Sequence, residues 1–379
     1  MAPSEKKFRI GVIGFGHMHI NDIMRRFNEV PNIQWVAGAD TIPDVPETKA
    51  ATFTRAWNVK YAHDEAGIPK IYADYHEMLN KEKFDVVAVY SENAQHGEIC
   101  EAIAAHHFNI LVEKPMASSL FEAIRMVRAA RNAGVKLIIN WPSTWLPTTT
   151  ALKHLIQDGI IGQPYQLKYR AAHNGPLGAG ASHQGVAATA DTLTDADRSR
   201  AWWYRANTGG GALLDFCSYG ACMSRWYFDA PAIAAFGMAA NLGSPFASAE
   251  DNAVISVRFP KSIALLEASW TTLDNGVNTG PIVYGEKGTL IVEEKDGKSM
   301  IKVLRGHGAE PEWIEPAALP VGRQSVAQEY VHWLTTGDPV HPTLEPEFNL
   351  EAMAILDAGK RSAASGKLEL VNDLRWCLG

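Results

Sequence analysis

The sequence predicts an α/β protein that begins with a doubly wound parallel sheet. An apolar run, residues 8–13, ends in the turn Gly14-Phe15-Gly16, as a buried parallel strand does when it leads into a helix. Segments with strand and helix patterns then alternate up to about residue 140, which is typical of a parallel sheet with helices on both faces. A second strand-like run, residues 33–39, ends at the acidic residue Asp40. Together these observations predict a Rossmann fold that binds a dinucleotide.

The glycine-rich turn is expected to hold a pyrophosphate. Gly14 and Gly16 let the backbone turn sharply and approach the phosphates, and the helix predicted at residues 17–28 offers N–H groups and a positive dipole end. His19 stands where the dinucleotide fingerprint usually has its third glycine, so an ordinary strand–helix turn is the alternative. The expected cofactor contacts of this turn are Gly14, Phe15, Gly16, His17 and Met18.

Asp40 favours NAD over NADP as the cofactor. A carboxylate at the end of the second strand can hold the ribose 2′-hydroxyl and repels a 2′-phosphate. No arginine follows Asp40 within the next few positions. A simple turn-forming role for Asp40 is the alternative.

The composition is that of an ordinary globular protein with two domains. The chain has 379 residues, of which 46% are hydrophobic and 20% charged, and single cores usually stop growing at about 250–300 residues. We therefore expect a nucleotide-binding domain at residues 1–141 and a second domain at residues 142–379. The net charge of −7 argues against a nucleic-acid partner.

We expect neither membrane insertion nor disulfide bonds. Residues 1–7 lack the apolar centre of a signal peptide, and we find no apolar run long enough to span a bilayer. The four cysteines are scattered without Cys-x-x-Cys spacing, as in a cytoplasmic protein with reduced thiols. No metal site is expected, because no carboxylate stands at ligand spacing from His173 or His183.

The other elements of the first domain continue the alternation. Strands are expected at residues 70–72, 85–90, 108–112 and 135–139, and helices at residues 46–57, 75–79, 96–106 and 118–133. Ser91 follows the strand 85–90 at its carboxyl end, where such sheets bind ligands.

The pattern changes after residue 141. A helix at 148–157 and an alternating strand at 165–170 precede a long loop of small residues at 175–197. Short strands are then expected at residues 253–259, 264–271, 281–284, 289–293 and 301–304, followed by helices at 322–334 and 350–364. Short strands separated by turns predict an antiparallel sheet.

Several motifs, in this order, resemble the glucose–fructose oxidoreductase/inositol dehydrogenase (Gfo/Idh/MocA) family. They are the first glycine turn, Asn93 and His96 before a helix, Glu113-Lys114-Pro115, and the run Gly209-Gly210-Gly211 preceded by tryptophans. The resemblance covers essentially the whole chain. It implies a Rossmann domain, a C-terminal α/β domain with a large, mostly antiparallel open sheet, and homodimers or homotetramers formed through that sheet. It places Asn93, His96, Glu113 and Lys114 at the cofactor.

Lys114 also has a physical argument for a catalytic role. Its ammonium, at the carboxyl end of a strand, would lie in the crevice where a nicotinamide binds. Oxidation of an alcohol requires loss of a hydride and of the hydroxyl proton, and a lysine partly removed from water can exchange that proton. A solvated lysine is the alternative, although Pro115 fixes the backbone at this position. In the family, the matching lysine is the catalytic one.

Asp215 and Tyr219 form the second predicted part of the site. A helix beginning near Gly211 places the two residues on one face, four positions apart. The family usually has glycine and histidine where this chain has Cys217 and Tyr219, and glucose–fructose oxidoreductase resembles this chain in having the tyrosine. Asp215 would orient a substrate hydroxyl, and Tyr219 would bond its oxygen. A packing role for both is the alternative.

Aromatic and basic residues nearby are the expected walls of the substrate site. Tryptophan faces stack on sugar rings, and arginine donates paired hydrogen bonds. The candidates are Trp141, Trp145, His173, Trp203 and Arg205.

These observations favour an NAD-dependent oxidoreductase that interconverts a secondary hydroxyl and a ketone of a sugar, cyclic polyol or sugar derivative. Two alternatives remain. One is a glycoside-cleaving enzyme that uses tightly bound NAD for transient oxidation and elimination. The other is a dinucleotide-binding sensor without turnover.

Overall fold

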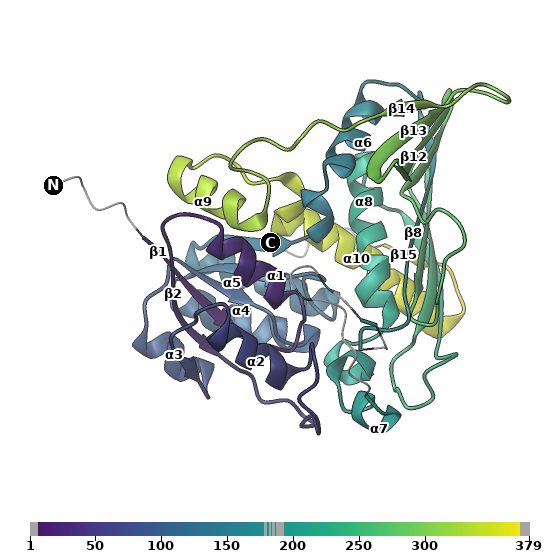
Figure 1. Ribbon diagram of the computed structural model, residues 1–379. Helices are drawn as coiled ribbons and strands as arrows, with labels where there is room; N and C mark the ends of the chain where they lie inside the picture. Colours follow the sequence, from purple (N-terminus) through teal and green to yellow (C-terminus); the bar gives the residue numbers. More distant parts are fainter. Residues whose placement is uncertain (1–6, 178–179, 182, 184–185, 187–192, 372–379) are drawn as a thin grey trace.

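The computed structural model describes residues 7–177, 180–181, 183, 186 and 193–371 (Figure 1). It contains a six-stranded sheet built from the first part of the chain and a nine-stranded sheet built from the second. The predicted fold class, a Rossmann sheet joined to an α/β part with a large, mostly antiparallel sheet, is confirmed. In the described ranges no helix is both long and apolar enough to cross a bilayer.

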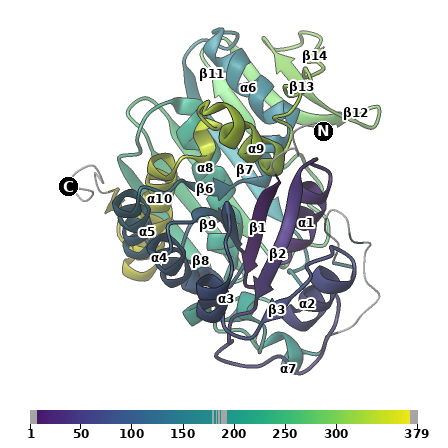
Figure 2. The ribbon, with the colours of Figure 1, turned by 90° about the vertical axis from the view of Figure 1, so that its left-hand side faces the viewer.

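The first sheet is parallel throughout, in the order β3-β2-β1-β4-β5-β6. Its strands are β1 (Phe8–Ile13), β2 (Ile33–Ala39), β3 (Ile71–Tyr72), β4 (Val86–Val89), β5 (Asn109–Glu113) and β6 (Leu137–Asn140). Its helices are α1 (Ile20–Asn28), α2 (Arg55–Asp64), α3 (Tyr75–Lys81), α4 (His96–Ala105) and α5 (Leu120–Ala133). In Figure 2, α1 and α2 lie on one face of this sheet and α4 and α5 on the other. Every residue of β4 and β6 is buried, as expected of strands covered on both faces.

The second sheet has the order β14-β13-β12-β11-β7-β10-β9-β8-β15 and is antiparallel except where β7 pairs with β10. Its central strands are β7 (Pro164–Ala172), β8 (Ala234–Ala240), β9 (Asn252–Arg258), β10 (Ile263–Ser269), β11 (Ile282–Gly285), β12 (Gly288–Lys295) and β13 (Lys298–Leu304). The short edge strands are β14 (Glu312–Ile314) and β15 (Glu369–Leu370). The sequence analysis did not predict β8, β14 or β15.

Three helices cover one face of the second sheet and join it to the first part of the chain. They are α6 (Pro147–Gln157), α8 (Ser218–Phe228) and α10 (Pro346–Ser365), and α10 also packs against α5. Figure 1 shows these helices between the nine-stranded sheet and the Rossmann sheet. The other two α-helices described in this part are the short α7 (Asp195–Arg198) and α9 (Val326–Thr336), and α9 packs against α1.

The helix predicted at residues 46–57 is wrong. The helix α2 begins only at Arg55, after Thr54 in an extended N-cap conformation. Phe53 has a left-handed φ of 71° and is buried, so a continuous helix through it is excluded. This loop turns Arg55 back toward the end of β2, where its side chain contacts Asp40.

Two other helix starts differ from the predicted ones. The first helix, α1, begins at Ile20 instead of residue 17, because it is preceded by a tighter turn in which the Ile20 N–H donates to His17 O and the Asn21 N–H to Met18 O, both at 3.2 Å. The helix expected from Gly211 begins with a π-helical turn, Leu213–Cys217, that continues into α8. Wide turns of this kind are frequent at functional sites. The long loop expected at residues 175–197 lies partly outside the described residues.

Candidate active site

Lys114 lies at the carboxyl end of the Rossmann sheet, directly after β5, and its side chain is buried. Its Nζ donates to Asp215 Oδ1 at 2.7 Å and to Asp215 O at 3.1 Å. The side chains of Lys114 and Asp215 are 1% and 10% exposed, so this ion pair is almost fully removed from water. The structure therefore brings together two residues, 101 positions apart, that the sequence analysis assigned to one site without predicting their contact.

The backbone around Asp215 is shaped by a close contact between two loops. Gly211 has a φ of +112°, and a Cβ there would lie 2.3 Å from Glu250 Oε1. The same Glu250 oxygen accepts from the Leu213 N–H at 3.1 Å, at the start of the π-helical turn. Ser218 Oγ donates to Asp215 O at 2.8 Å. Glycine at position 211 and the Glu250 carboxylate therefore fix the turn that presents Asp215 to Lys114.

Trp270 is a site residue that the sequence analysis missed. It follows β10, and its Nε1 donates to Asp215 Oδ2 at 3.2 Å. Both oxygens of Asp215 are thus held, one by Lys114 and the other by Trp270. The sequence predicted a strand at residues 264–271, which contains Trp270. It did not indicate the contact with Asp215, because the two residues are 55 positions apart in the chain.

Tyr219 lies against the same ion pair. Lys114 Nζ is 4.5 Å from the centre of the Tyr219 ring, which is a cation–π distance. Burial raises the pKa of Tyr219 well above its usual value, and the nearby carboxylates of Glu113 and Asp215 raise it further. The phenol therefore keeps its proton at neutral pH and can donate it in a hydrogen bond.

The glycine turn has the features that a dinucleotide requires. Gly14 has a φ of +84°, and a Cβ there would lie 2.5 Å from Ser91 Cα, so only glycine fits. Near this turn, some polar atoms are buried without a hydrogen-bond partner among the described residues. They include His17 Nε2, Asn93 Oδ1 and His96 Nε2. Such atoms usually find a partner, and a dinucleotide with its phosphates, ribose hydroxyls and amide can supply them. The residues present fit this cofactor.

The other residues predicted to contact the cofactor include Phe15, Met18, Asn93 and His96, and each has different neighbours in the structure. Phe15 and Met18 are buried, and the Phe15 carbonyl accepts from Asn58 Nδ2 at 2.8 Å. Asn93 Nδ2 donates to Gly209 O at 2.8 Å, which ties the turn after β4 to the glycine run. Burial lowers the pKa of His96, whose Nδ1 lies 3.3 Å from Met116 O. These residues hold the loops around the cofactor crevice.

Asp40 is paired with an arginine that is distant in sequence. Asp40 Oδ1 accepts from Arg55 Nη1 at 2.7 Å and from the Thr41 N–H at 2.8 Å. Arg55 is buried, and its Nη2 also donates to Glu92 Oε1 at 2.8 Å. One guanidinium therefore lies between two carboxylates, and Asp40 stays 26% exposed.

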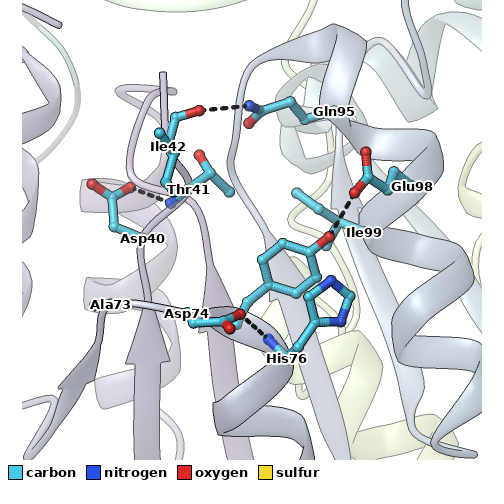
Figure 3. A pocket seen from close by; sticks show the side chains of 10 residues that line it. Asp40, Thr41, Ile42, Ala73, Asp74, His76, Gln95, Glu98 and Ile99 are labelled. Carbon is cyan, nitrogen blue, oxygen red and sulfur yellow. Dashed lines mark hydrogen bonds between the residues drawn. The ribbon is translucent and has the colours of Figure 1, made fainter. Parts of the chain in front are cut away.

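A cavity of about 410 Å³ opens beside Asp40 at the carboxyl ends of β2 and β3 (Figure 3). Ile42 and Ile99 contribute apolar side chains to its lining. Gln95 Nε2 donates to Ile42 O at 3.4 Å across the rim, as Figure 3 shows. This is the place in a Rossmann sheet where the nucleoside next to the second strand binds.

The predicted substrate-wall residues have different contacts. Trp141 packs edge-on against Tyr219, at 5.7 Å between ring centres, and its Nε1 donates to Asn349. His173 packs against Phe216, and burial lowers its pKa while Asp215 opposes that shift. Trp145 ends the 3-10 turn Pro142–Trp145 that follows β6, and its Nε1 donates to Asn140 Oδ1 at 3.5 Å.

Trp203 lies at the first glycine turn, whereas Arg205 lies near Asp44. Trp203 is buried, stacks on Trp202 at 4.0 Å and lies 4.6 Å from the His17 ring. Trp202 Nε1 donates to Gly16 O at 2.8 Å. Arg205 lies 3.8 Å from Asp44. Trp202 and Trp203 therefore pack over the turn that contains Gly16 and His17.

The comparisons with known proteins agree with this architecture. Residues 8–141 match the oxidoreductase family with an NAD-binding Rossmann fold, GFO/IDH/MocA, and residues 149–291 match the GFO/IDH/MocA C-terminal domain. The chain belongs to this family of oxidoreductases.

One curated relative is D-apiose dehydrogenase of Rhizobium rhizogenes, 31% identical over 107 residues. That match covers 28% of this chain and only 31% of the relative. Among solved structures, aldose-aldose oxidoreductase from Caulobacter crescentus, complexed with glycerol, has a TM-score of 0.73 at 20% identity, covering 96% of this chain and 100% of that chain. The WlbA dehydrogenase from Bordetella pertussis, in complex with NADH and UDP-GlcNAcA, has a TM-score of 0.72 at 21% identity, covering 97% of this chain and 100% of that chain. At these identities the structural likeness shows the fold.

Proposed function

We propose that this protein is an NAD-dependent dehydrogenase that interconverts a secondary hydroxyl and a ketone of a sugar, cyclic polyol or sugar derivative. The observation that carries the proposal is the buried Lys114–Asp215 pair at the carboxyl end of the Rossmann sheet. It lies at the edge of the sheet where the dinucleotide turn and the segment from the second domain meet. Bound NAD⁺ would supply the hydride acceptor.

Lys114 is the group that we assign to proton transfer. Its ammonium is held by Asp215 in a site removed from bulk water, where it can give a proton to a substrate oxygen during reduction and, as the free amine, take that proton during oxidation. Asp215, fixed by Lys114 and Trp270, positions that ammonium. Tyr219, with its raised pKa, donates a hydrogen bond to the same substrate oxygen instead of acting as the base.

Asp40 supports NAD as the preferred cofactor. Its carboxylate is partly exposed at the rim of the cavity beside β2, where it can accept from ribose hydroxyls. The positive charge of Arg55 is shared between Asp40 and Glu92, so it offers little attraction for a 2′-phosphate.

The substrate class rests on the neutral, hydrogen-bonding character of the site and on the relatives. Around Lys114, Trp270 donates through its indole, Tyr219 donates through its phenol, and burial lowers the pKa of His173 so that its ring is neutral. Groups of this kind suit hydroxyl-rich, uncharged rings. D-apiose dehydrogenase and aldose-aldose oxidoreductase are named for such substrates.

The uncovered face of the nine-stranded sheet supports assembly into a homodimer or homotetramer. Helices cover the other face (Figure 1), while Phe236, Met238, Ile263 and Tyr284 are exposed by 39%, 63%, 48% and 37%. Apolar patches of this kind commonly mark an interface. Light scattering after gel filtration tests this assembly, and a monomer at every concentration would contradict it.

A substrate panel tests the proposed reaction. We expect the purified protein to form NADH with at least one sugar or polyol, and to form the corresponding ketone in equal amount. Cleavage of a glycoside without net NADH would instead favour transient oxidation and elimination. Dinucleotide binding without turnover of any compound would favour a sensor.

A further inference from the structure

His17, His19 and Glu113 form a compact group at the carboxyl ends of β1 and β5. Each residue offers one metal-ligating atom, and these atoms lie within 4.8 Å of one another. His19 Nδ1 is 2.7 Å from Glu113 Oε1, and the ring centres of His17 and His19 are 4.4 Å apart. No metal-ligand spacing in the sequence predicts this group, because Glu113 is 94 positions from His19.

The charge of Glu113 is buried without an ammonium or guanidinium bonded to it in the described structure. Its side chain is fully buried, and its oxygens are bonded by His19 Nδ1 and by Asn140 Nδ2 at 2.9 Å. Lys114 is next in the chain but directs its ammonium to Asp215. A buried carboxylate is costly unless a cation compensates it. Burial raises the pKa values of Tyr90 and Tyr219, and the nearby carboxylate of Glu113 raises both further.

His17 is buried beside His19 and Glu113. Its Nδ1 accepts from the His19 N–H at 3.2 Å, and its Nε2 is buried without a partner among the described residues. An imidazole whose Nδ1 accepts carries its proton on Nε2, so a metal ion would bind at Nδ1 in place of the His19 N–H, or at Nε2 after that proton moves.

We propose that His17, His19 and Glu113 bind one divalent transition-metal ion, with Zn²⁺ as the first candidate. Two imidazoles and one carboxylate with an open position are a ligand set that zinc enzymes use. Imidazole nitrogen favours zinc, copper, iron or nickel over magnesium and calcium. Asn140 holds the Glu113 carboxylate, as outer residues usually do at metal sites. This site goes beyond the proposed dehydrogenase; it shares His17 and Glu113 with the expected cofactor contacts, but metal binding there requires neither cofactor nor substrate.

Metal binding can be measured without cofactor or substrate. The full-length protein, without a histidine tag, is stripped with a chelator and titrated with Zn²⁺ and with Co²⁺, whose visible absorption reports its coordination. We expect one ion per chain to remain after gel filtration. Glu113→Gln keeps the shape of the side chain and should abolish that binding. Asn140→Ala should weaken it by about 10- to 100-fold, the usual effect of an outer residue.

A surface histidine provides the control. His63 is exposed beside Asp64, so His63→Ala should leave the ion count unchanged. Circular dichroism of every variant checks that the fold is intact. The proposal is overturned if the wild type retains no ion. It is also overturned if Glu113→Gln, or a folded His17→Ala/His19→Ala double variant, binds as the wild type does. In that case His19 and Glu113 form only a hydrogen-bonded pair.

Discussion

Replacement of Lys114 by methionine tests the assigned proton transfer most sharply. Methionine keeps much of the length and the apolar stem of the side chain but has no proton to exchange. We expect turnover to fall by about 10²–10⁴-fold, the usual contribution of a general acid–base group. Dinucleotide binding, followed by protein fluorescence, should change much less, because the glycine turn and Asp40 are separate from this side chain.

The same change should also cost stability, for a reason visible in the structure. Asp215 would remain buried without the ammonium that now lies 2.7 Å away. Removal of one member of a buried pair costs about 3–5 kcal/mol. The double variant Lys114→Met/Asp215→Asn removes both charges, so it should regain part of that stability without regaining turnover. Thermal unfolding and steady-state NADH formation measure the two effects separately.

Lys153 provides a matched control for the loss of a buried lysine. It is 6% exposed on α6, and its Nζ donates to Trp226 O at 2.6 Å. Lys153→Met should lower stability and leave turnover within a few fold of the wild type. If folded Lys114→Met kept turnover within about tenfold of the wild type, the assignment of Lys114 to proton transfer would be refuted.

Four further predictions follow from the site and its surroundings. Asp40→Ser should weaken NAD and admit NADP, as shown by KM for both cofactors; a wild type that already prefers NADP would contradict the reading of Asp40. Trp270→Phe should reduce kcat by about tenfold, because one bond to a charged group is typically worth about 1.5–3 kcal/mol; an unchanged kcat would mean that Asp215 does not need this bond. Tyr219→Phe should lower turnover and leave the midpoint of the pH–rate profile in place, because the raised pKa keeps the phenol protonated; loss of that midpoint would identify tyrosinate as the base. Burial lowers the pKa of His341 from 6.5 to about 4, so its neutral form adds stability that is fully present above pH 6.5 and is lost as the pH falls toward 4; His341→Gln should flatten the denaturant-measured stability in that window, and an unchanged slope would exclude this contribution.

The sequence predicted the Rossmann half well, because buried parallel strands are apolar along their whole length. The predicted strands at residues 85–90 and 108–112 overlap β4 and β5, which are wholly or almost wholly buried. The helix at 118–133 was also signalled locally, since Ser119 caps α5 by accepting from the Glu122 N–H and Gly134 ends the helix in a left-handed conformation.

The errors came from contacts that local patterns do not encode. The loop before α2 depends on the left-handed Phe53 and on Arg55 reaching back to Asp40, which is 15 positions away. Trp270 reaches Asp215 only because β10 and the π-helical turn pack together in the second domain. His19 replaces a glycine in the fingerprint, and its contact with Glu113 exists only once β1 and β5 lie in one sheet.

The central claim is that the site transfers a hydride from a substrate carbon to the nicotinamide. It is tested most directly with the best substrate of the panel, deuterated at the carbon that bears the oxidised hydroxyl. We expect the deuterium to appear in NADH, one per ketone formed, when both products are analysed by mass spectrometry. Lys114→Met should form both far more slowly. Substrate consumption with no deuterated NADH, or with the deuterium returned to a cleaved product, would contradict the account.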